Sequence, residues 1–310
     1  MSEHRILLIE NPASLSVDLG RLRIRREGFA DSFVLPRDIA VLCLHHHTIQ
    51  ISVQTFRVLA EAGASVMVTD EFHHPCAWLL PQVGNGDLMR RLRQQMVLDG
   101  SPQKSVLWQA LVQARLSTQA ANLRVLNRKS ALRLERLVNE VQPADKTKCE
   151  GQGAKHYWAY LFEGVFSREK QGADDAINAR LNFGYAVLRS MVARSLVLAG
   201  LNPALGLGHC SMENPFNLAD DFIEPYRFVV ERHVVKSQLG GFSGEFDSTA
   251  RKALLGFVEQ EIQLGVAGYR LPSAINESVA SFVRILDGKA KVLNLPQDSL
   301  MQADEDESWV

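Results

Sequence analysis

The sequence has few cysteines and no long hydrophobic run, and both absences narrow the class of protein. Only four of its 310 residues are cysteines, and no two of them form a Cys-x-x-Cys pair. Such spacing favours reduced thiols over a disulfide framework or a structural zinc site. No stretch approaches the roughly 20 consecutive apolar residues of a membrane-spanning helix, and the N-terminus lacks the features of a signal peptide. We therefore expect a cytoplasmic protein without a membrane partner.

The chain also lacks an excess of either charge. Lysine and arginine together number 34, aspartate and glutamate number 35, and the formal net charge is −1. This balance gives no global reason to expect a polyanionic partner, so any nucleic-acid surface must be local. A hydrophobic share of 46% excludes a disordered chain, and the length suffices for two domains.

Basic residues concentrate in segment 90–148. Twelve basic residues stand there against four acidic ones, a local excess of +8. Such a segment suits a phosphate backbone, because neutralised phosphates release their counterions and this favours binding whatever the sequence. A solvated helix face explains the same composition equally well. Composition alone therefore leaves the role of this segment open.

The first eighty or so residues are expected to form short strands, because polar and apolar positions alternate between turn residues. The expected strands cover residues 14–19, 21–25, 32–35, 39–44, 65–69 and 76–80. One amphipathic helix is expected at 52–61. We interpret residues 1–83 as a small N-terminal antiparallel β domain, followed by a linker at 84–92 that contains glycine and asparagine.

From about residue 88 the spacing of apolar residues becomes three or four, which is typical of helices. Further helices are expected at 153–166, 173–199, 222–230, 248–263 and 275–286. The pattern predicts an α+β protein in which the N-terminal β domain precedes a larger all-α domain over 93–290. A C-terminal segment with an acidic tail covers 291–310.

Three acidic residues and one histidine are candidates for chemistry. Asp221 and Glu224 are three residues apart, so on a helix both carboxylates project from one face, close enough to share a cation. His209, in a glycine-rich loop, can fold back onto that face, and Glu150 opens another expected helix. Carboxylates with one imidazole form a ligand set for Mg²⁺ or Mn²⁺ and suggest metal-assisted phosphoryl chemistry. Acidic pairs at this spacing are also common on exposed helices, so spacing alone leaves the metal site open.

Several segments, in order along the chain, resemble one known family. They are the strand pattern within 7–39, Glu-Gly-x-x-Ala-Lys-His-Tyr-Trp at 150–158, Asp-x-x-Asn-x-x-Leu-Asn-Phe-Gly-Tyr at 175–185, and Gly-His at 208–209 with Asp-x-x-Glu-Pro-Tyr-Arg at 221–227. The family is that of the CRISPR-associated spacer-acquisition integrases, metal-dependent DNA endonucleases that insert new spacers into a CRISPR array. The chain departs from it modestly, for example with Lys155 where arginine is more usual.

The resemblance implies a ligand set and a reaction. It assigns Glu150, His209 and Glu224 as ligands of Mg²⁺ or Mn²⁺ and Asp221 as a further acidic residue of the catalytic site. The adjacent Asp220 leaves open which aspartate faces the metal. The implied reaction is a transesterification, in which a 3′-hydroxyl on the incoming DNA attacks a phosphodiester at the leader-repeat boundary.

The resemblance also implies partners. It suggests a homodimer in which the N-terminal domain serves dimerisation and partner contacts, and in which the helical domain is catalytic. A small dimeric companion protein of CRISPR adaptation completes a heterohexamer that holds double-stranded DNA. We assign DNA contacts to six basic residues: Arg90, Arg91, Arg93, Arg128, Lys148 and Lys155.

Two other classes of function fit parts of the sequence. Cys149 lies beside Glu150 and Cys210 beside His209, so a Cys-His hydrolase is one alternative. A non-catalytic DNA-binding scaffold is the other, since it needs the basic segment but not the acidic residues and histidine. Chelation separates the three, because EDTA stops a metal nuclease, thiol alkylation stops a hydrolase, and neither affects a scaffold.

Overall fold

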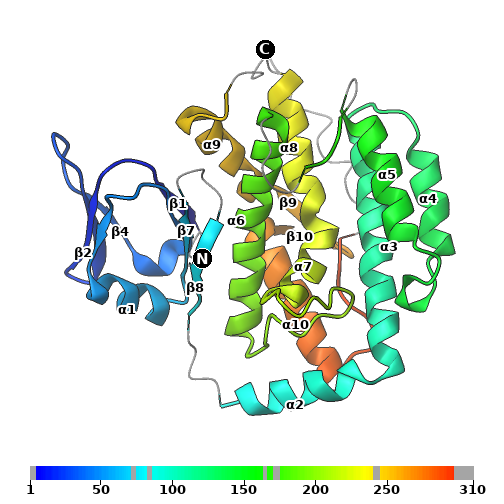
Figure 1. Ribbon diagram of the computed structural model, residues 1–310. Coiled ribbons are helices and arrows are strands. Elements are labelled where there is room, and N and C mark those ends of the chain that lie inside the picture. The colour runs from blue at the N-terminus through cyan, green and yellow to red at the C-terminus, as the bar shows by residue number, and fades with distance from the viewer. Residues whose placement is uncertain are drawn as a thin grey trace.

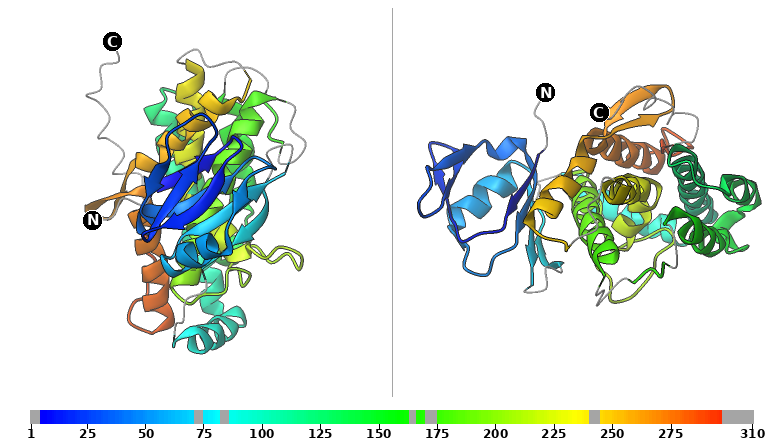
Figure 2. Two further views of the ribbon diagram at one scale, coloured as in Figure 1. Left: turned by 90° about the vertical axis from the view of Figure 1, so that its left-hand side faces the viewer. Right: turned by 90° about the horizontal axis from the view of Figure 1, so that it is seen from above.

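The computed structural model describes residues 5–70, 75–81, 86–162, 166–169, 175–239 and 245–296. A β-rich N-terminal region lies beside a larger helical region (Figures 1 and 2). Within the described residues, strands β1 to β8 and helix α1 precede α2, and the remaining α-helices follow it. The expected fold class, a β region followed by a larger helical region, is confirmed.

One of the two N-terminal sheets has mixed pairing. Its order is β1-β5-β7-β8, where the strands are β1 (Arg5–Ile9), β5 (Ile39–Leu44), β7 (Ser65–Thr69) and β8 (Pro75–Leu79). The pairs β1–β5 and β5–β7 are parallel, and only β7–β8 is antiparallel. The expectation of antiparallel pairing is therefore wrong for most of this sheet. Its parallel strands are joined by long crossovers, which parallel pairing requires.

The second sheet follows the sequence prediction more closely. Its order is β4-β3-β2-β6, with β2 (Ser14–Asp18), β3 (Arg21–Arg25), β4 (Ser32–Val34) and β6 (Gln50–Ile51). The strand β3 is antiparallel to both β2 and β4, while the short β6 is parallel to β2. Helix α1 (Val53–Glu61) is capped at its start by Ser52, whose Oγ accepts the Thr55 N–H at 3.3 Å.

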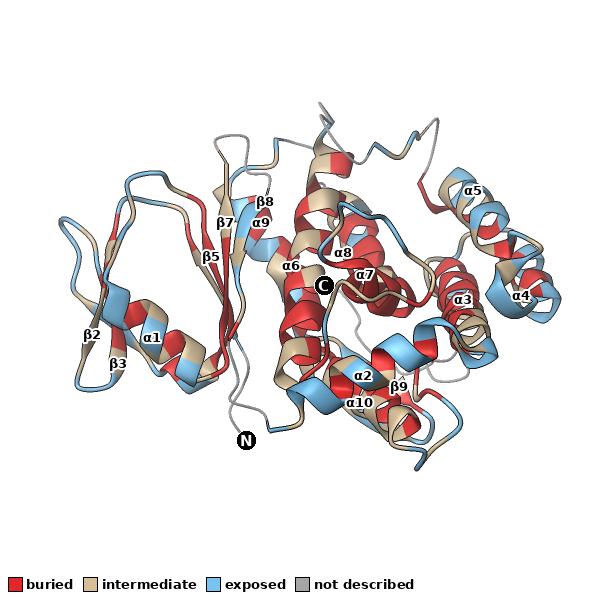
Figure 3. Ribbon diagram, turned by 60° about the horizontal axis from the view of Figure 1, so that its bottom comes forward, coloured by how far each residue is buried: buried red, intermediate tan, exposed pale blue. Residues whose placement is uncertain are grey.

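Both faces of the first sheet are covered. Leu42 packs in a core with Leu15 and Leu22 of the second sheet and Leu59 of α1. The opposite face belongs to the core of the helical region, and there Trp78 Nε1 donates to Ser190 Oγ of α6 (Ala176–Leu198) at 2.9 Å. Burial on both sides explains why every residue of β5 is apolar and buried (Figure 3).

In the helical region, α6 lies beside the N-terminal sheet and contacts α7, α8 and α10 (Figure 3). Its other helices are α2 (Leu88–Asp99), α3 (Pro102–Val125), α4 (Ala131–Glu140), α5 (Cys149–Leu161), α7 (Asn217–Ile223), α8 (Arg227–Leu239), α9 (Ser248–Leu254) and α10 (Leu271–Leu286). Short 3-10 turns are η1 (Pro36–Asp38), η2 (Pro143–Asp145), η3 (Glu224–Tyr226) and η4 (Leu255–Glu259). None of the helices described is long and apolar enough to cross a membrane.

The expectation of a purely helical second domain needs one correction. The helix predicted at 248–263 ends at Leu254, and the chain continues as η4 and then as the hairpin β9 (Glu261–Leu264) and β10 (Ala267–Arg270). Gly265 supplies the positive φ of +62° in the two-residue turn. Alternation of buried Ile262 and Leu264 with more accessible neighbours is the strand signal that the helical interpretation overlooked.

The predicted domain limits remain predictions. Strand β8 ends at Leu79 and α2 begins at Leu88, so the predicted linker 84–92 overlaps the first turn of α2. Residues 82–85, which include the first two positions of that linker, lie outside the described part of the chain, as do residues from 297 onward, which include the acidic tail.

Candidate active site

Glu150 lies in the first helical turn of α5, and its position is fixed by the segment that precedes α5. The carboxylate of Asp145 accepts the N–H of Cys149 at 2.8 Å and the N–H of Glu150 at 3.0 Å. It thereby satisfies two of the N–H groups that a helix start leaves without partners. Ala144, Asp145 and Lys148 adopt positive φ, which is uncommon for residues other than glycine. A strained but well-bonded turn therefore presents Glu150.

Glu224 lies at a break between two helices. The helix predicted at 222–230 is divided, because α7 ends at Ile223, the η3 turn follows, and α8 begins at Arg227. Pro225 cannot donate a helical hydrogen bond, which accounts for the break. Glu224 is buried, and its Oε1 accepts a hydrogen bond from Arg227 Nη1 at 2.8 Å. Its other oxygen faces a different arginine.

Arg115 of α3 joins the two glutamates. Its Nη1 lies 2.5 Å from Glu150 Oε1 and 2.6 Å from Glu224 Oε2. Helix α3 packs against both α5 and η3, and Figure 1 shows α3 beside α5. One buried nitrogen therefore lies between carboxylates that are 74 positions apart in the sequence. Two of the residues expected to bind metal are thus brought together. In the sequence, Arg115 is one of twelve basic residues of segment 90–148, and nothing in its spacing indicates this contact.

Asp221 has a different position from the one that its spacing suggested. It is fully buried, and its carboxylate accepts the N–H of Leu207 at 2.5 Å and the N–H of His209 at 2.9 Å. The same carboxylate is 2.8 Å from His209 Nδ1. Asp221 and Glu224 thus have different partners, and their sharing of a cation stays a prediction. Asp221 instead holds the loop that carries His209.

Asn217 and two glycines complete the support of this loop. Asn217 Nδ2 donates to the carbonyls of Ala204 and Ser211, at 3.2 and 2.8 Å, and so ties the two ends of the loop together. A Cβ on Gly208 would lie 2.2 Å from the Trp108 ring, and one on Gly206 would lie 2.1 Å from the His209 carbonyl oxygen. The loop therefore needs glycine at both positions.

Trp108 also lies against the imidazole. The rings of Trp108 and His209 meet edge to face, with centroids 5.7 Å apart. Trp108 and Arg115 are seven residues apart on α3 and so lie on the same face of that helix. One helix face thus contacts His209 and both glutamates.

Burial and neighbouring charges shift the pKa values of His209, Asp221 and Glu224. The hydrogen bond to Asp221 raises the pKa of His209, against the lowering effect of burial. Burial raises the pKa of Asp221, and the contacts with His209 only partly offset this effect. Burial alone would also raise the pKa of Glu224, but Arg115 and Arg227 outweigh it and hold that pKa below its usual value. Glu224 is therefore an ionised carboxylate at neutral pH.

A buried polar network lies behind Glu224. The Arg227 guanidinium stacks on the ring of Tyr185, 4.2 Å from its centroid. The hydroxyls of Tyr185 and Tyr157 each donate to one oxygen of Glu231 at 2.7 Å. This network fixes Arg227, and Arg227 in turn fixes Glu224. The two tyrosines lie in the segments that resemble the family, but no sequence spacing indicated Glu231.

Asp220 faces away from this cluster. Its Oδ1 lies 2.7 Å from Arg189 Nε of α6, and its Oδ2 accepts from Asn214 Nδ2 at 2.7 Å. Of the two adjacent aspartates, Asp221 is the one whose carboxylate contacts the ring of His209. Which of the two aspartates faces the metal was the question that the sequence left open, and these contacts favour Asp221.

The residues fit a divalent metal in their chemistry, although they are not arranged as a finished cage. Among the described residues, no group of three or more histidine, cysteine, aspartate or glutamate side chains has metal-binding spacing. Yet Glu224 Oε2 is buried and receives no well-directed hydrogen bond within the described chain, and it shares Arg115 Nη1 with Glu150. Two convergent carboxylate oxygens beside an imidazole are suitable donors for Mg²⁺ or Mn²⁺.

The six basic residues assigned to DNA fall into two groups. Arg91 is buried, and its Nη1 lies 2.5 Å from Asp287 Oδ1 beyond the end of α10, so the structure gives it an internal partner. Arg90 is exposed and lies 3.2 Å from the same Asp287 oxygen. Arg93, Lys148 and Lys155 are exposed and Arg128 is half-buried, so these four remain accessible to a nucleic acid.

The cysteines show no arrangement that favours the hydrolase. All four are free thiols. Cys149 is buried, and its Sγ lies 3.1 Å from Thr147 Oγ1. Cys210 is exposed, while the Nδ1 of the adjacent His209 is bonded to Asp221.

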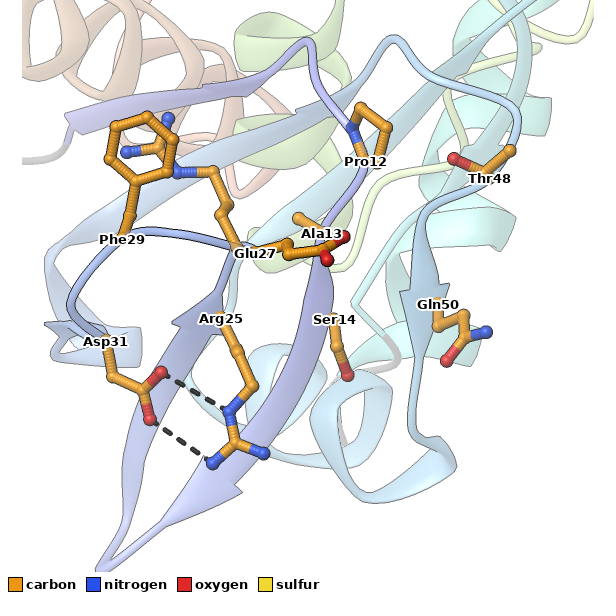
Figure 4. A pocket seen from close by; sticks show the side chains of 10 residues that line it. Pro12, Ala13, Ser14, Arg25, Glu27, Phe29, Asp31, Thr48 and Gln50 are labelled. Atoms are coloured by element: carbon orange, nitrogen blue, oxygen red, sulfur yellow. Dashed lines mark hydrogen bonds and ion pairs between the residues drawn. The ribbon is translucent and has the colours of Figure 1, made fainter.

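A hollow elsewhere in the molecule does not belong to this site. It encloses about 530 Å³ at the end of the second N-terminal sheet (Figure 4). Arg25 and Asp31 pair across one side, and Phe29, Ser14 and Gln50 also line it. Its lining includes neither of the glutamates nor the histidine described above.

Comparison with known proteins assigns the family. The sequence profile of the family described as CRISPR associated protein Cas1 matches residues 6–252. The CRISPR-associated endonuclease Cas1 of Neisseria meningitidis serogroup C (strain 8013) is 36% identical over 297 residues, which cover 94% of this chain and 96% of that protein. These matches define the class of protein as a CRISPR-associated endonuclease. The chain belongs to the Cas1 family, and the predicted endonuclease and integrase class and its dependence on a divalent metal are confirmed.

Solved structures share the fold. A casposase bound to integration product has a TM-score of 0.80 and 17% identity, covering 94% of this chain and 92% of that chain. A Cas1 protein from Thermotoga maritima has a TM-score of 0.77 and 13% identity, covering 92% of this chain and 98% of that chain. A Cas6-RT-Cas1–Cas2 complex has a TM-score of 0.77 and 16% identity, covering 97% of this chain and 37% of that one.

Proposed function

We propose that this chain inserts short double-stranded DNA fragments as new spacers into a CRISPR array, with Mg²⁺ or Mn²⁺ bound by Glu150, His209 and Glu224. The convergence of Glu150 and Glu224 on one atom of Arg115 carries the proposal. His209 is close enough to Glu224 for the charge of each to shift the pKa of the other. The donors come from α5, η3 and the loop before α7, so the fold, and not local spacing, assembles them.

The proposed reaction exchanges one phosphodiester bond for another. The 3′-hydroxyl oxygen of the incoming strand forms a bond to phosphorus, the bond to the 3′-oxygen of the target strand breaks, and the hydroxyl proton is transferred in the same exchange to the leaving oxygen. A divalent ion held by Glu150, His209 and Glu224 would supply Lewis-acid chemistry here, because it would polarise the phosphoryl oxygen and stabilise charge on the entering and leaving oxygens. Water in place of the hydroxyl gives endonuclease cleavage.

Each residue of the site then has a distinct task. Because an ionised Asp221 has no hydrogen to donate, His209 Nδ1 carries the proton, and Nε2 is left as the ligand atom. Arg227 holds Glu224 Oε1, so that Glu224 Oε2 is directed toward the shared position. Asp145 fixes the start of α5 and with it the position of Glu150.

The partners follow from the same assignment. We propose a homodimer that joins a small dimeric companion in a heterohexamer, which is supported by the likeness to a complex that contains Cas1 and Cas2. We further propose that DNA follows the accessible basic residues Arg93, Arg128, Lys148 and Lys155, which lie on and around α2 to α5. The protein would act in the cytoplasm, where the array DNA is present.

A strand-joining assay tests this function. Purified protein with its small partner is given a short 3′-hydroxyl duplex and a supercoiled plasmid that carries the repeat, with Mg²⁺, Mn²⁺ or EDTA. We expect joining with either metal, loss of joining with EDTA, and loss in Glu150→Gln, His209→Ala and Glu224→Gln while DNA binding persists. Glu259→Gln is the matched control, because Glu259 is exposed and pairs with Arg270. Joining that survives in the Glu150→Gln and Glu224→Gln proteins would contradict the assignment.

A further inference from the structure

Among the described residues, the side chain of Arg115 has few polar contacts apart from the two glutamates. Its side chain is buried on α3, and its Nη1 contacts both Glu150 and Glu224. Its Nε is buried without a hydrogen-bond partner among the described residues. A buried guanidinium is costly unless it is fully paired, so this one is held mainly by the two carboxylates.

Arg227 provides the contrast. It binds the other oxygen of Glu224 and is fixed by stacking on Tyr185. Arg227 can therefore remain in place whatever occupies the space between the glutamates. Arg115 occupies that space itself, since the two oxygens proposed as metal ligands both lie within 2.6 Å of its Nη1.

A divalent ion and this guanidinium exclude each other. Arginine stays protonated in proteins and has no lone pair to offer a metal, so it cannot become a ligand. Both cations need the same two oxygens, and two positive charges repel at such a distance. Metal binding must therefore break both contacts of Arg115 Nη1.

We propose that Arg115 is an internal counter-cation, which holds Glu150 and Glu224 together in the metal-free protein and is displaced when the divalent metal binds. The proposal rests on the metal site of the proposed function. The guanidinium keeps two like charges close, so that the ligands are assembled before the metal arrives. It also competes with the metal and so weakens the measured affinity.

Removal of Arg115 should separate its stabilisation of the metal-free site from its competition with the metal. In Arg115→Gln the metal-free protein should unfold at a lower temperature in EDTA, because two carboxylates lose their shared partner. Its Kd for Mn²⁺, measured by calorimetry, should be at least fivefold lower than that of the wild type. Added Mn²⁺ should also raise the Tm of Arg115→Gln by more than it raises the Tm of the wild type. Arg124→Gln is the control, because Arg124 is on the same helix and pairs with Glu135 away from the site.

A measurement on the unaltered side chain covers the case in which Arg115→Gln does not fold. The Nε–H resonance of Arg115 in the wild-type protein, assigned by its loss in Arg115→Lys, should shift as Mg²⁺ is added, while that of Arg124 stays in place. An unshifted resonance at saturating Mg²⁺, or an unchanged or weaker Mn²⁺ affinity in a folded Arg115→Gln protein, overturns the role of Arg115. If Mn²⁺ does not bind the wild-type protein, or if its binding persists in Glu150→Gln and Glu224→Gln, the proposed metal site itself is wrong instead.

Discussion

Asp221 accepts a hydrogen bond from Nδ1 of His209 over 2.8 Å, and through this contact Asp221 orients the imidazole ring of His209. The backbone N–H of His209 donates to the same carboxylate oxygen at 2.9 Å. Main chain and ring are thus held together, and the second ring nitrogen is left for another partner. A carboxylate behind a ligating histidine is a common arrangement in metal sites.

The first prediction compares the two adjacent aspartates. Asp221→Asn should weaken Mn²⁺ binding by about 10- to 100-fold, as is typical when a ligating histidine no longer has its carboxylate partner. Asp220→Asn should leave Mn²⁺ binding unchanged, because Asp220 pairs with Arg189 and Asn214. Calorimetric titration of both proteins checks this, and equal losses in the two variants would count against the role given to Asp221.

The second prediction concerns the glycine that packs on Trp108. Gly208→Ala should destabilise the protein by about 1 to 3 kcal/mol, as overpacking usually does, and should reduce joining more than DNA binding because the loop carries His209. Gly151→Ala is the control, since a Cβ there meets open space beside Glu150. Chemical unfolding and joining assays on both proteins provide the comparison. Normal joining by Gly208→Ala would show that the loop tolerates displacement.

The third prediction is a pH dependence at the contact between α2 and Asp287. The hydrogen bond from Arg91 lowers the pKa of Asp287 from 3.8 to about 2. A lowered folded-state pKa means that the stabilisation is fully present above the unfolded value and is lost as the pH falls from about 4 toward 2. Asp287→Asn should therefore cost about 1.5 to 3 kcal/mol at pH 7, and the difference from the wild type should shrink below pH 4.

Urea unfolding between pH 3 and pH 7 measures this difference. Asp99→Asn is the control, because Asp99 forms an exposed pair with Lys104 and such pairs contribute little. A difference for Asp287→Asn that stays constant down to pH 3 would mean that the ion pair with Arg91 does not stabilise the fold.

The fourth prediction tests the accessible basic residues. Arg93→Gln and Lys155→Gln should weaken DNA binding whatever the sequence. For every phosphate that is no longer neutralised, the slope of log K against log salt should become shallower by about 0.9. Arg57→Gln on α1 is the control, since Arg57 is exposed and pairs with Glu61. Fluorescence anisotropy across a salt series measures the slopes, and slopes that match those of the control would remove these residues from the DNA surface.

The fifth prediction separates metal from thiol chemistry. Joining should stop in EDTA and return with added Mn²⁺, whereas Cys149→Ser and Cys210→Ser should each retain it. Cys149 is buried near Thr147, and Cys210 is exposed. Loss of joining in either serine variant, with Mn²⁺ binding intact, would favour the Cys-His hydrolase.

Much of the fold could be predicted from local pattern. Strands β3, β5 and β7 have the bounds that alternation and apolar runs indicated, and α1 begins after the predicted Ser52. Pairing direction could not be predicted in this way, because it depends on which distant strands meet. The buried run of β5 was the available signal, since strands covered on both faces are typically parallel.

The site was predictable only in part. Glu150, His209 and Glu224 were found through the resemblance, and the spacing of Asp221 and Glu224 suggested a shared cation. The break at Pro225 and the N–H groups of the loop give these two carboxylates different partners. Arg115 could not be identified from the sequence, because its contacts are set by the packing of α3 against α5 and η3.

The most direct test is a crystal structure of the protein with Mn²⁺, with anomalous scattering used to locate the ion. We expect an anomalous peak bound by Glu150, Glu224 and Nε2 of His209, with the Arg115 guanidinium moved from between the two glutamates. The same crystals of Glu224→Gln should lack the peak. An Mn²⁺ peak at other residues, or none at saturating Mn²⁺ in protein that joins DNA, would contradict the proposed metal site.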